Sequence, residues 1–302
     1  MSKNIIVIGS CNTDMVIKVD RLPVPGETVI GDSFMMNPGG KGANQAVAAA
    51  RLNGNVYFIA KTGNDLFGRR SVELYEDEGI HVGNIYSDSS LPSGVALITV
   101  DTNGENSIAV ASGANKSLSP DDIRQAQSVI EKGDILLMQL EIPIETVEYA
   151  AQLASEKGIK VILNPAPACS LPATLLKNLY MIIPNETEAE MLSGIKVTDW
   201  ESAQKAADTI SRKGVDIVVI TMGAKGAFVK ENDNYYRVSV PPVKALDTTA
   251  AGDTFCGALC VALSENMKVL DAVKFACKCA SITVTRMGAQ SSLPYRKEID
   301  QL

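Results

Sequence analysis

Between residues 119 and 220, short apolar runs alternate with longer segments in which apolar residues recur every three to four positions. The short runs predict buried strands, and the longer segments predict helices that cover them. This alternation is typical of a parallel sheet with helices on both faces, and so of an α/β fold. The predicted strands are 135–138, 160–163, 181–183 and 216–220, and the predicted helices are 119–131, 144–156, 172–177 and 199–213.

The N-terminal third mixes this pattern with short strand signals. Apolar segments at 15–19, 28–30 and 33–36 surround a Pro- and Gly-rich break and predict a small antiparallel patch. The runs 94–100 and 106–110 flank Asp101-Thr-Asn-Gly104, which is a strong hairpin signal. We expect these segments to form a lid. The remaining elements predicted here are strand 5–8, helix 45–52, strand 56–60 and helix 66–78.

The C-terminal part predicts strands at 227–230 and 236–240, followed by helices at 257–264 and 270–285. No linker, repeat or low-complexity segment interrupts the chain. We therefore predict a single domain over residues 1–302, with lid strands inserted at roughly 14–37 and 93–111.

Composition narrows the class of protein. Of the 302 residues 46% are hydrophobic, and the net charge is −7, as in ordinary soluble globular proteins. No Lys/Arg block stands out, which argues against a nucleic-acid partner. No apolar run is long enough to span a membrane, and the first one is too short for a signal peptide. The six cysteines lack zinc-type spacing, so we expect a reducing cytoplasm.

The chain has one histidine, His81, which argues against a Ser-His-Asp triad and against a metal site built from histidines. Its neighbours, Gly79-Ile80 and Gly83-Asn84, favour a solvated loop.

Polar residues follow several predicted strands at the point where each strand ends. In open α/β sheets the carboxyl ends of the strands meet at one edge, where ligands bind, so we expect these residues to form one site. An Asx-turn is the plain alternative for the first two. They are Asn12, Asp14, Glu141, Asn164, Asn185 with Glu188, and the segment from Thr221 to Gly226.

Two of these groups suit a nucleotide. Asn185 and Glu188 could order a hydrated Mg²⁺, which prefers oxygen ligands. Thr221, Gly223 and Gly226 could wrap phosphates with hydroxyl and backbone N–H groups. Plain structural roles compete with these: a helix cap for Asn185, and a tight hairpin for the two glycines.

Residues 247–255, Asp-Thr-Thr-Ala-Ala-Gly-Asp-Thr-Phe, lead into an apolar helical segment. Gly252 has no Cβ, so the backbone there can come close to a ligand. Ala250 and Ala251 leave their N–H groups uncovered, and N–H groups at a helix start attract anions. Asp253 lies in the same turn and would repel a phosphate. It makes better sense as a base that takes a proton from a hydroxyl. An ordinary N-terminal helix charge is the alternative.

Residues 38–44, Pro-Gly-Gly-Lys-Gly-Ala-Asn, precede the predicted helix 45–52. The glycines would let a sugar lie against bare backbone, and Lys41 and Asn44 offer donors. The Walker spacing is absent, and a plain glycine turn is the alternative.

Two segments carry a family resemblance. Gly39-Gly-Lys-Gly-Ala-Asn-Gln-Ala46 and the 247–255 segment resemble the two signatures of the ribokinase/PfkB sugar kinases. Asn164-Pro-Ala-Pro167, Pro184-Asn-Glu-Thr-Glu188 and Gly288-Ala-Gln-Ser-Ser292 fit the same family in the same order, so the resemblance covers essentially the whole chain.

The resemblance implies a Rossmann-like three-layer α/β/α sandwich with a small β-sheet lid, through which such proteins often form a homodimer. It implies phosphoryl transfer from ATP to the 5-hydroxyl of D-ribose. A kinase for 2-deoxyribose, another pentose or a nucleoside is the alternative within the class. A sugar-binding regulator built on an inactive kinase fold is the alternative from another class.

The resemblance also implies roles for individual residues. Asp253 would be the catalytic base, with Ala250, Ala251 and Gly252 as the anion hole. The sugar would be held by Asn12, Asp14, Gly40, Lys41, Asn44 and Glu141. ATP would be bound by Asn185, Thr221, Gly223, Ala224, Gly226 and Gly252, with Glu188 acting on Mg²⁺ and Cys277 near the adenine. K⁺ would be held by Asp247, Thr249, Thr283, Arg286, Gly288 and Ser292, mostly through backbone carbonyls.

Overall fold

The computed structural model describes residues 3–240 and 242–301. Within these residues the centre is a nine-stranded sheet in the order β13-β12-β11-β10-β9-β8-β1-β4-β5. From β11 to β5 the strands pair in parallel, while β12 and β13 extend one edge antiparallel. The strands are β1 Asn4–Ile8, β4 Asn55–Gly63, β5 His81–Asp88, β8 Ile135–Met138, β9 Lys160–Leu163, β10 Met181–Ile182, β11 Ile217–Thr221, β12 Ala227–Glu231 and β13 Asn234–Val238.

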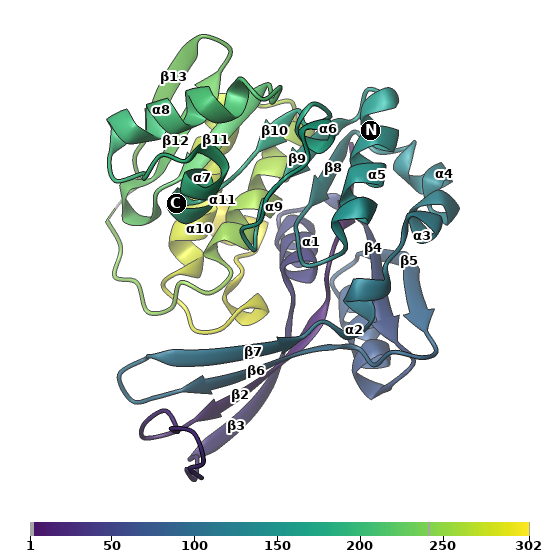
Figure 1. The fold of residues 1–302 in the computed structure, drawn as a ribbon, viewed down its shortest axis with the longest axis vertical. Coiled ribbons are helices and arrows are strands. Elements are labelled where there is room, and N and C mark those ends of the chain that lie inside the picture. The colour runs from purple at the N-terminus through teal and green to yellow at the C-terminus, as the bar shows by residue number, and fades with distance from the viewer. Residues whose placement is uncertain (1–2, 241, 302) are drawn as a thin grey trace.

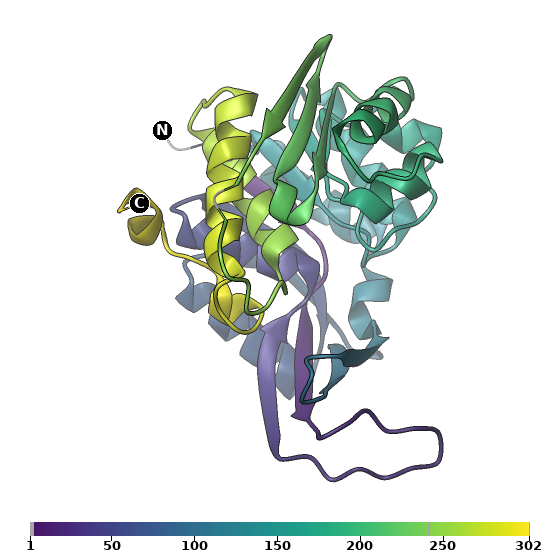
Figure 2. The same cartoon turned by 90° about the vertical axis from the view of Figure 1, so that its left-hand side faces the viewer.

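Helices cover both faces of this sheet because its central strands bury both sets of alternate side chains. In β1, Ile5 and Val7 pack toward one helix layer, and Ile6 and Ile8 pack toward the other. One layer holds α1 Lys41–Arg51, α2 Leu66–Asp77, α9 Ala251–Ser264, α10 Val269–Thr283 and α11 Arg296–Asp300. The other holds α3 Pro120–Gln125, α4 Gln127–Ile130, α5 Ile144–Glu156, α6 Ala173–Leu176, α7 Glu186–Ser193 and α8 Trp200–Ser211. Figure 2 shows the two layers on opposite sides of the sheet, so the predicted three-layer sandwich is confirmed. None of the helices in the described ranges is long and apolar enough to cross a membrane.

A second sheet in the described residues, ordered β3-β2-β6-β7, projects from the sandwich as a lid (Figure 1). Its strands are β2 Asn12–Lys18, β3 Ser33–Gly39, β6 Gly94–Val100 and β7 Asn106–Ala111. The predicted hairpin around residues 101–104 is confirmed, since Val100 pairs with Asn106. The strand predicted at 28–30 is wrong. Lys18, the last residue of β2, pairs with Ser33, and this segment lies beyond the paired region.

Three predicted helices have different bounds. α1 begins at Lys41 because Gly40, with φ 88°, turns the chain directly into the helix. α9 begins at Ala251, well before the apolar run that signalled it. The predicted helix 119–131 is split at Ala126 into α3 and α4.

The loop predicted at His81 is also wrong, because His81 begins the edge strand β5. The side chain is exposed, as expected. It stacks on Tyr57, with ring centroids 4.2 Å apart, and its Nε2 lies 3.0 Å from Asn55 Oδ1. An edge strand leaves many side chains in solvent, so β5 lacks the all-apolar signature of its neighbours.

Candidate active site

A cavity of about 420 Å³ lies between the carboxyl ends of the central strands and the inner face of the lid. Its lid wall includes the apolar side chains Ala96, Ile98, Ile108 and Val110. The facing wall is polar and comes from strand ends and from the first turns of α1, α7 and α9. It brings together Asn12, Asp14, Gly40, Lys41, Asn44, Glu141, Asn164, Asn185, Glu188, Thr221, Thr249, Ala250, Gly252 and Asp253.

Asp253 lies in the first turn of α9 and is only 7% exposed. Its Oδ2 accepts a hydrogen bond from Asn44 Nδ2, and its Oδ1 accepts one from Gln45 Nε2, both at 3.0 Å. Burial raises the pKa of Asp253, while the charge of Lys41 and the two side-chain donors act in the opposite direction. The carboxylate is thus fixed in position, and its basicity is increased.

Three further carboxylates share the cavity with Lys41. Burial, followed by the charges of Glu141 and Asp253, raises the pKa of Asp14 to about 6. Burial also raises the pKa of Glu188, against the Asn185 N–H and Lys41. Burial would lower the pKa of Lys41, but the surrounding carboxylates outweigh it and raise that pKa. Lys41 therefore offers a positive charge to an incoming phosphate or sugar oxygen.

Glu141 links the end of β8 to the start of α1. Its Oε2 accepts hydrogen bonds from Ser10 Oγ at 2.5 Å and from the Lys41 N–H at 3.0 Å. A carboxylate at a helix N-terminus is stabilised by the unpaired N–H groups and by the helix dipole. Glu141 thereby holds the glycine turn of residues 39–42 against the sheet.

The turn before α9 is open toward the cavity. Ala250 caps the helix in the left-handed region, with φ 59°, and no atom of a neighbouring segment lies within 4 Å of a Cβ placed on Gly252. The Ala251 N–H donates to the Thr248 carbonyl at 3.2 Å, and Ala251 is not among the cavity-lining residues. The space at Gly252 therefore fits an anion better than that at Ala251.

The predicted nucleotide residues divide into two groups. Asn185 and Glu188 form a capping box on α7: the Glu188 N–H donates to Asn185 Oδ1 at 2.8 Å, and the Asn185 N–H donates to Glu188 Oε2 at 2.9 Å. The helix cap is therefore present, and both residues still line the cavity. Thr221 ends β11 beside Asn185 and lines it as well.

Gly252 lines the cavity too, whereas the remaining predicted nucleotide residues, Gly223, Ala224, Gly226 and Cys277, are not among its lining residues. Gly223 and Ala224 belong to the turn between β11 and β12, and Gly223 faces open space. Gly226, with φ 97°, leaves no room for a Cβ, which would lie 1.9 Å from the Val238 carbonyl oxygen. The hairpin alternative is thus present too. Cys277 is 5% exposed within the core, and burial raises its thiol pKa to about 12.

The residues that the family resemblance assigns to a cation lie on two adjoining loops and on the end of α10. The Asp247 carboxylate accepts hydrogen bonds from the Thr249 N–H at 2.9 Å and from the Gly288 N–H at 2.8 Å. Burial would raise the pKa of Asp247, but the hydrogen bond from the Thr249 hydroxyl, together with those from the two N–H groups, outweighs it and lowers that pKa. The Arg286 guanidinium pairs with the Glu298 carboxylate, so only the backbone carbonyl of Arg286 is a candidate ligand for a cation.

The donor atoms at these loops are oxygens. No group of three or more His, Cys, Asp or Glu side chains in the described ranges is placed to hold a metal. The donors that these residues offer are backbone carbonyl, hydroxyl and carboxylate oxygens, and hard cations prefer oxygen donors. The residues are Asp247, Thr249, Thr283, Arg286, Gly288 and Ser292.

Residues 2–296 match the family described as pfkB family carbohydrate kinase. The chain belongs to this family. A ribokinase of Haemophilus influenzae is 47% identical over 298 residues, 99% of this chain and 97% of that relative. A deoxyribokinase of Salmonella typhi is 38% identical, covering 99% of this chain and 98% of that one. The structure of an Arabidopsis thaliana ribokinase complexed with ribose and ATP matches with a TM-score of 0.93 at 32% identity, covering 100% of this chain and 98% of that one.

In this pfkB-family site, sequence reasoning missed the residues that hold Asp253 in place. Gln45 Nε2 donates to Asp253 and also to Asn164 Oδ1 at 3.1 Å, and Gln45 Oε1 accepts from Gln139 Nε2 at 2.6 Å. Gln45 and Gln139 are completely buried. The signal was only that Gln45 follows Asn44 in the glycine motif. Ser10 and Asn115, which contact Glu141 and Asn12, were missed as well.

Proposed function

We propose that this pfkB-family kinase is a ribokinase, which transfers the γ-phosphoryl group of ATP to the 5-hydroxyl of D-ribose and releases ADP and D-ribose 5-phosphate. Relatives named ribokinase support the substrate, among them the Arabidopsis enzyme complexed with ribose and ATP. The observation that carries the proposal is Asp253, buried and held by two donors beside the open turn at Gly252.

The sugar binds between the lid and α1. Asn12 and Asp14 from β2 face its secondary hydroxyls, with Gly40, Lys41 and Glu141 on the other side. Asn44 Oδ1 is buried and has no hydrogen-bond partner in the described part of the chain, so a sugar hydroxyl would satisfy it. The apolar lid residues exclude water from the bound sugar and from ATP.

Asp253 then acts as the general base. It accepts the proton of the 5-hydroxyl as the hydroxyl oxygen bonds to the γ-phosphorus and the bond to the bridging oxygen of ADP breaks. The N-terminus of α9 at Gly252 and the Lys41 ammonium stabilise the negative charge on the phosphoryl group in the transition state of the transfer.

Two cations fit the proposal. Asn185 and Glu188 would order the hydrated Mg²⁺ carried by ATP, which neutralises phosphate charge. The loops around Asp247 and Gly288 would hold K⁺, which would stabilise the adjoining anion-hole turn through its charge. Nucleotide binding is further assigned to the turn at Gly223 and Ala224, to Gly226 and to Cys277 on α10.

We further propose a homodimer formed through the lids. Along β2, Asn12 and Asp14 face the cavity, so alternate residues face outward. The outward face is apolar, and its exposed fractions are 43% for Ile17, 56% for Phe34, 56% for Met36 and 56% for Leu97. An exposed apolar face of this kind marks an interaction surface. We also propose that the enzyme is cytoplasmic. We propose that its chain forms one domain with an inserted lid.

Initial rates of ADP formation across ribose, 2-deoxyribose, fructose and adenosine, with Mg²⁺ and with or without K⁺, test the function. We expect a strong preference for ribose and a drop in rate without K⁺. Turnover of 2-deoxyribose at or above that of ribose would favour the alternative shared with the Salmonella typhi relative. Sugar binding without any phosphorylated product would instead indicate a sugar-binding regulator.

A further inference from the structure

Asn115 lies in the short 3₁₀ helix η1, Gly113–Ser117, directly after the lid strand β7. It is 1% exposed and does not line the cavity. Its Oδ1 accepts from the Cys11 N–H at 2.9 Å, and its Nδ2 donates to the Cys11 carbonyl at 3.1 Å. The same Nδ2 donates to Asn12 Oδ1 at 2.7 Å. One buried amide therefore clamps the junction between β1 and β2, where the chain enters the lid.

These contacts determine which way the Asn12 amide points. A backbone N–H can only donate and a carbonyl can only accept, so Cys11 fixes which end of the Asn115 amide is oxygen and which is nitrogen. Asn115 Nδ2 must then face the oxygen of Asn12. Because an amide is planar, the NH₂ group of Asn12 is left pointing the other way, and Asn12 lines the cavity.

Asp14 follows two residues later on the same face of β2, about 7 Å along the strand. The pair therefore presents an amide donor and a carboxylate acceptor side by side. A sugar hydroxyl has one proton. A hydroxyl that donates this proton to Asp14, Glu141 or Asp253 can form further hydrogen bonds only as an acceptor. The Asn12 NH₂ group is a donor for such a bond.

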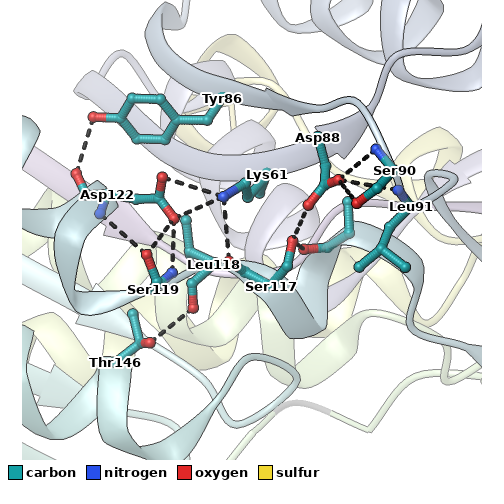
Figure 3. Close-up of polar contacts among 11 residues, drawn as sticks. Lys61, Tyr86, Asp88, Ser90, Leu91, Ser117, Leu118, Ser119, Asp122 and Thr146 are labelled. Carbon is teal, nitrogen blue, oxygen red and sulfur yellow. Dashed lines mark hydrogen bonds and ion pairs between the residues drawn. The ribbon is translucent and has the colours of Figure 1, made fainter.

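The turn that carries Asn115 is itself anchored (Figure 3). Ser117 Oγ has two acceptors for its one proton, Asp88 Oδ2 at 2.6 Å and the Ala114 carbonyl at 2.9 Å. Figure 3 shows the contact with Asp88. Lys61 Nζ donates to the Ser117 carbonyl at 3.3 Å and pairs with Asp122 at 3.0 Å. On the other side, Gly94 of β6 leaves the space that the two amides need. A Cβ there would lie 2.1 Å from Asn12 Oδ1 and 2.3 Å from Asn115 Nδ2.

We propose that Asn115 is a specificity-determining positioning residue: it holds the Asn12 amide with its NH₂ toward the sugar, so that the site selects a sugar with a secondary hydroxyl at that point. The inference rests on the proposed ribokinase function. It assigns the choice between ribose and its deoxy analogues to a residue that touches neither substrate.

Asn115→Asp tests this with nearly the same shape. The carboxylate keeps the bond from the Cys11 N–H but can donate neither to the Cys11 carbonyl nor to Asn12 Oδ1, so the Asn12 amide is no longer held and a carbonyl can face the sugar. We expect KM for ribose to rise roughly 10- to 100-fold, the range for one misdirected buried hydrogen bond. The kcat at saturating ribose and KM for ATP should stay within about threefold, because the base and the nucleotide residues are untouched.

The decisive readout compares ribose with 2-deoxyribose and 3-deoxyribose. An analogue that lacks the hydroxyl bound by Asn12 has no contact to lose, so Asn115→Asp should cost that analogue at most about twofold. Gly94→Ala adds a Cβ on β6 that displaces the same two amides, so it should reproduce this pattern. It replaces Asn115→Asp as the test if that variant does not fold. Ser117→Ala is the control, because it loosens the turn while leaving the Asn115 amide in place.

An equal loss on all three sugars, in a folded variant, would overturn the proposal. So would the same loss in Ser117→Ala, because the effect would then come from the turn alone. If the wild-type enzyme fails to phosphorylate ribose at all, the proposed function itself is wrong, and the two failures are thereby distinguished.

Discussion

Replacing Gln45 with methionine removes a buried donor from the proposed catalytic base. Gln45 Nε2 donates to Asp253 Oδ1 at 3.0 Å, and a donor to a carboxylate stabilises the ionised form. A hydrogen bond to a charged group contributes about 1.5–3 kcal/mol. At 1.36 kcal/mol per unit, its loss should raise the pKa of Asp253 by about 1–2 units. Only the ionised carboxylate can accept the sugar proton, so the acid limb of kcat/KM should move to higher pH by that amount.

The same substitution also lowers stability. It leaves Gln139 Nε2 and Asn164 Oδ1 without their partner, and each unpaired buried group costs about 1–3 kcal/mol. Chemical denaturation should therefore show a loss of about 2–6 kcal/mol in the free energy of unfolding, summed over the two groups. A variant that remains folded at 25 °C can still be assayed between pH 5 and 9.

Gln139→Met is the matched control for this prediction. It removes a donor to Gln45 but leaves both donors to Asp253 in place, and it deletes Gln139 Oε1, which is buried without a partner in the described residues. It should lower stability while moving the acid limb by less than about half a unit, since no bond to the carboxylate is lost. If both variants shift the limb equally, or if neither does, the assignment of Gln45 as the donor that tunes the base is wrong.

Three other variants test separate parts of the account. The pKa of Asp14 is raised from 3.8 to about 6, so the folded protein becomes less stable as pH rises through that window and the buried carboxyl ionises. Asp14→Asn removes this charge, so it should raise the free energy of unfolding at pH 7.5 by about 1–3 kcal/mol. The same variant should raise KM for ribose. Gly226→Ala forces a Cβ against the Val238 carbonyl at a positive φ and should cost about 1–3 kcal/mol in thermal or chemical denaturation; an unchanged stability would contradict the packing. Leu97→Asp places a charge on the outward lid face, through which we propose that the homodimer forms. Sedimentation should therefore show folded monomers of the variant and dimers of the wild type.

Much of the central sheet could be predicted because its strands bury both faces. β8 and β9 are short apolar runs, and their bounds match the prediction. β5 escaped prediction because an edge strand with Gly83 and Asn84 carries no such signal. Helix starts that depend on a glycine turn, as at Gly40, were predicted too late. The backbone geometry begins such a helix, and no apolar repeat marks its first residues.

The cavity residues with local motifs were found from sequence, whereas their supports were not. Gln45 is 208 residues from Asp253 in the chain, and Asn115 is 104 residues from Cys11. Nothing in a short window reveals contacts at such separations. Both residues are buried polar groups whose role depends on the partners that the fold brings to them.

Asp253 is proposed to accept the proton of the ribose 5-hydroxyl during phosphorylation. The most direct measurement compares wild type with Asp253→Asn in one assay, with the product identified by NMR and with ATP and ribose binding measured by calorimetry. We expect ribose 5-phosphate from wild type. The variant should turn over about 10²–10⁴-fold more slowly, the range for a general base, and still bind ATP. A variant that keeps more than about a tenth of wild-type turnover, or a wild-type product phosphorylated at another position, would contradict the account.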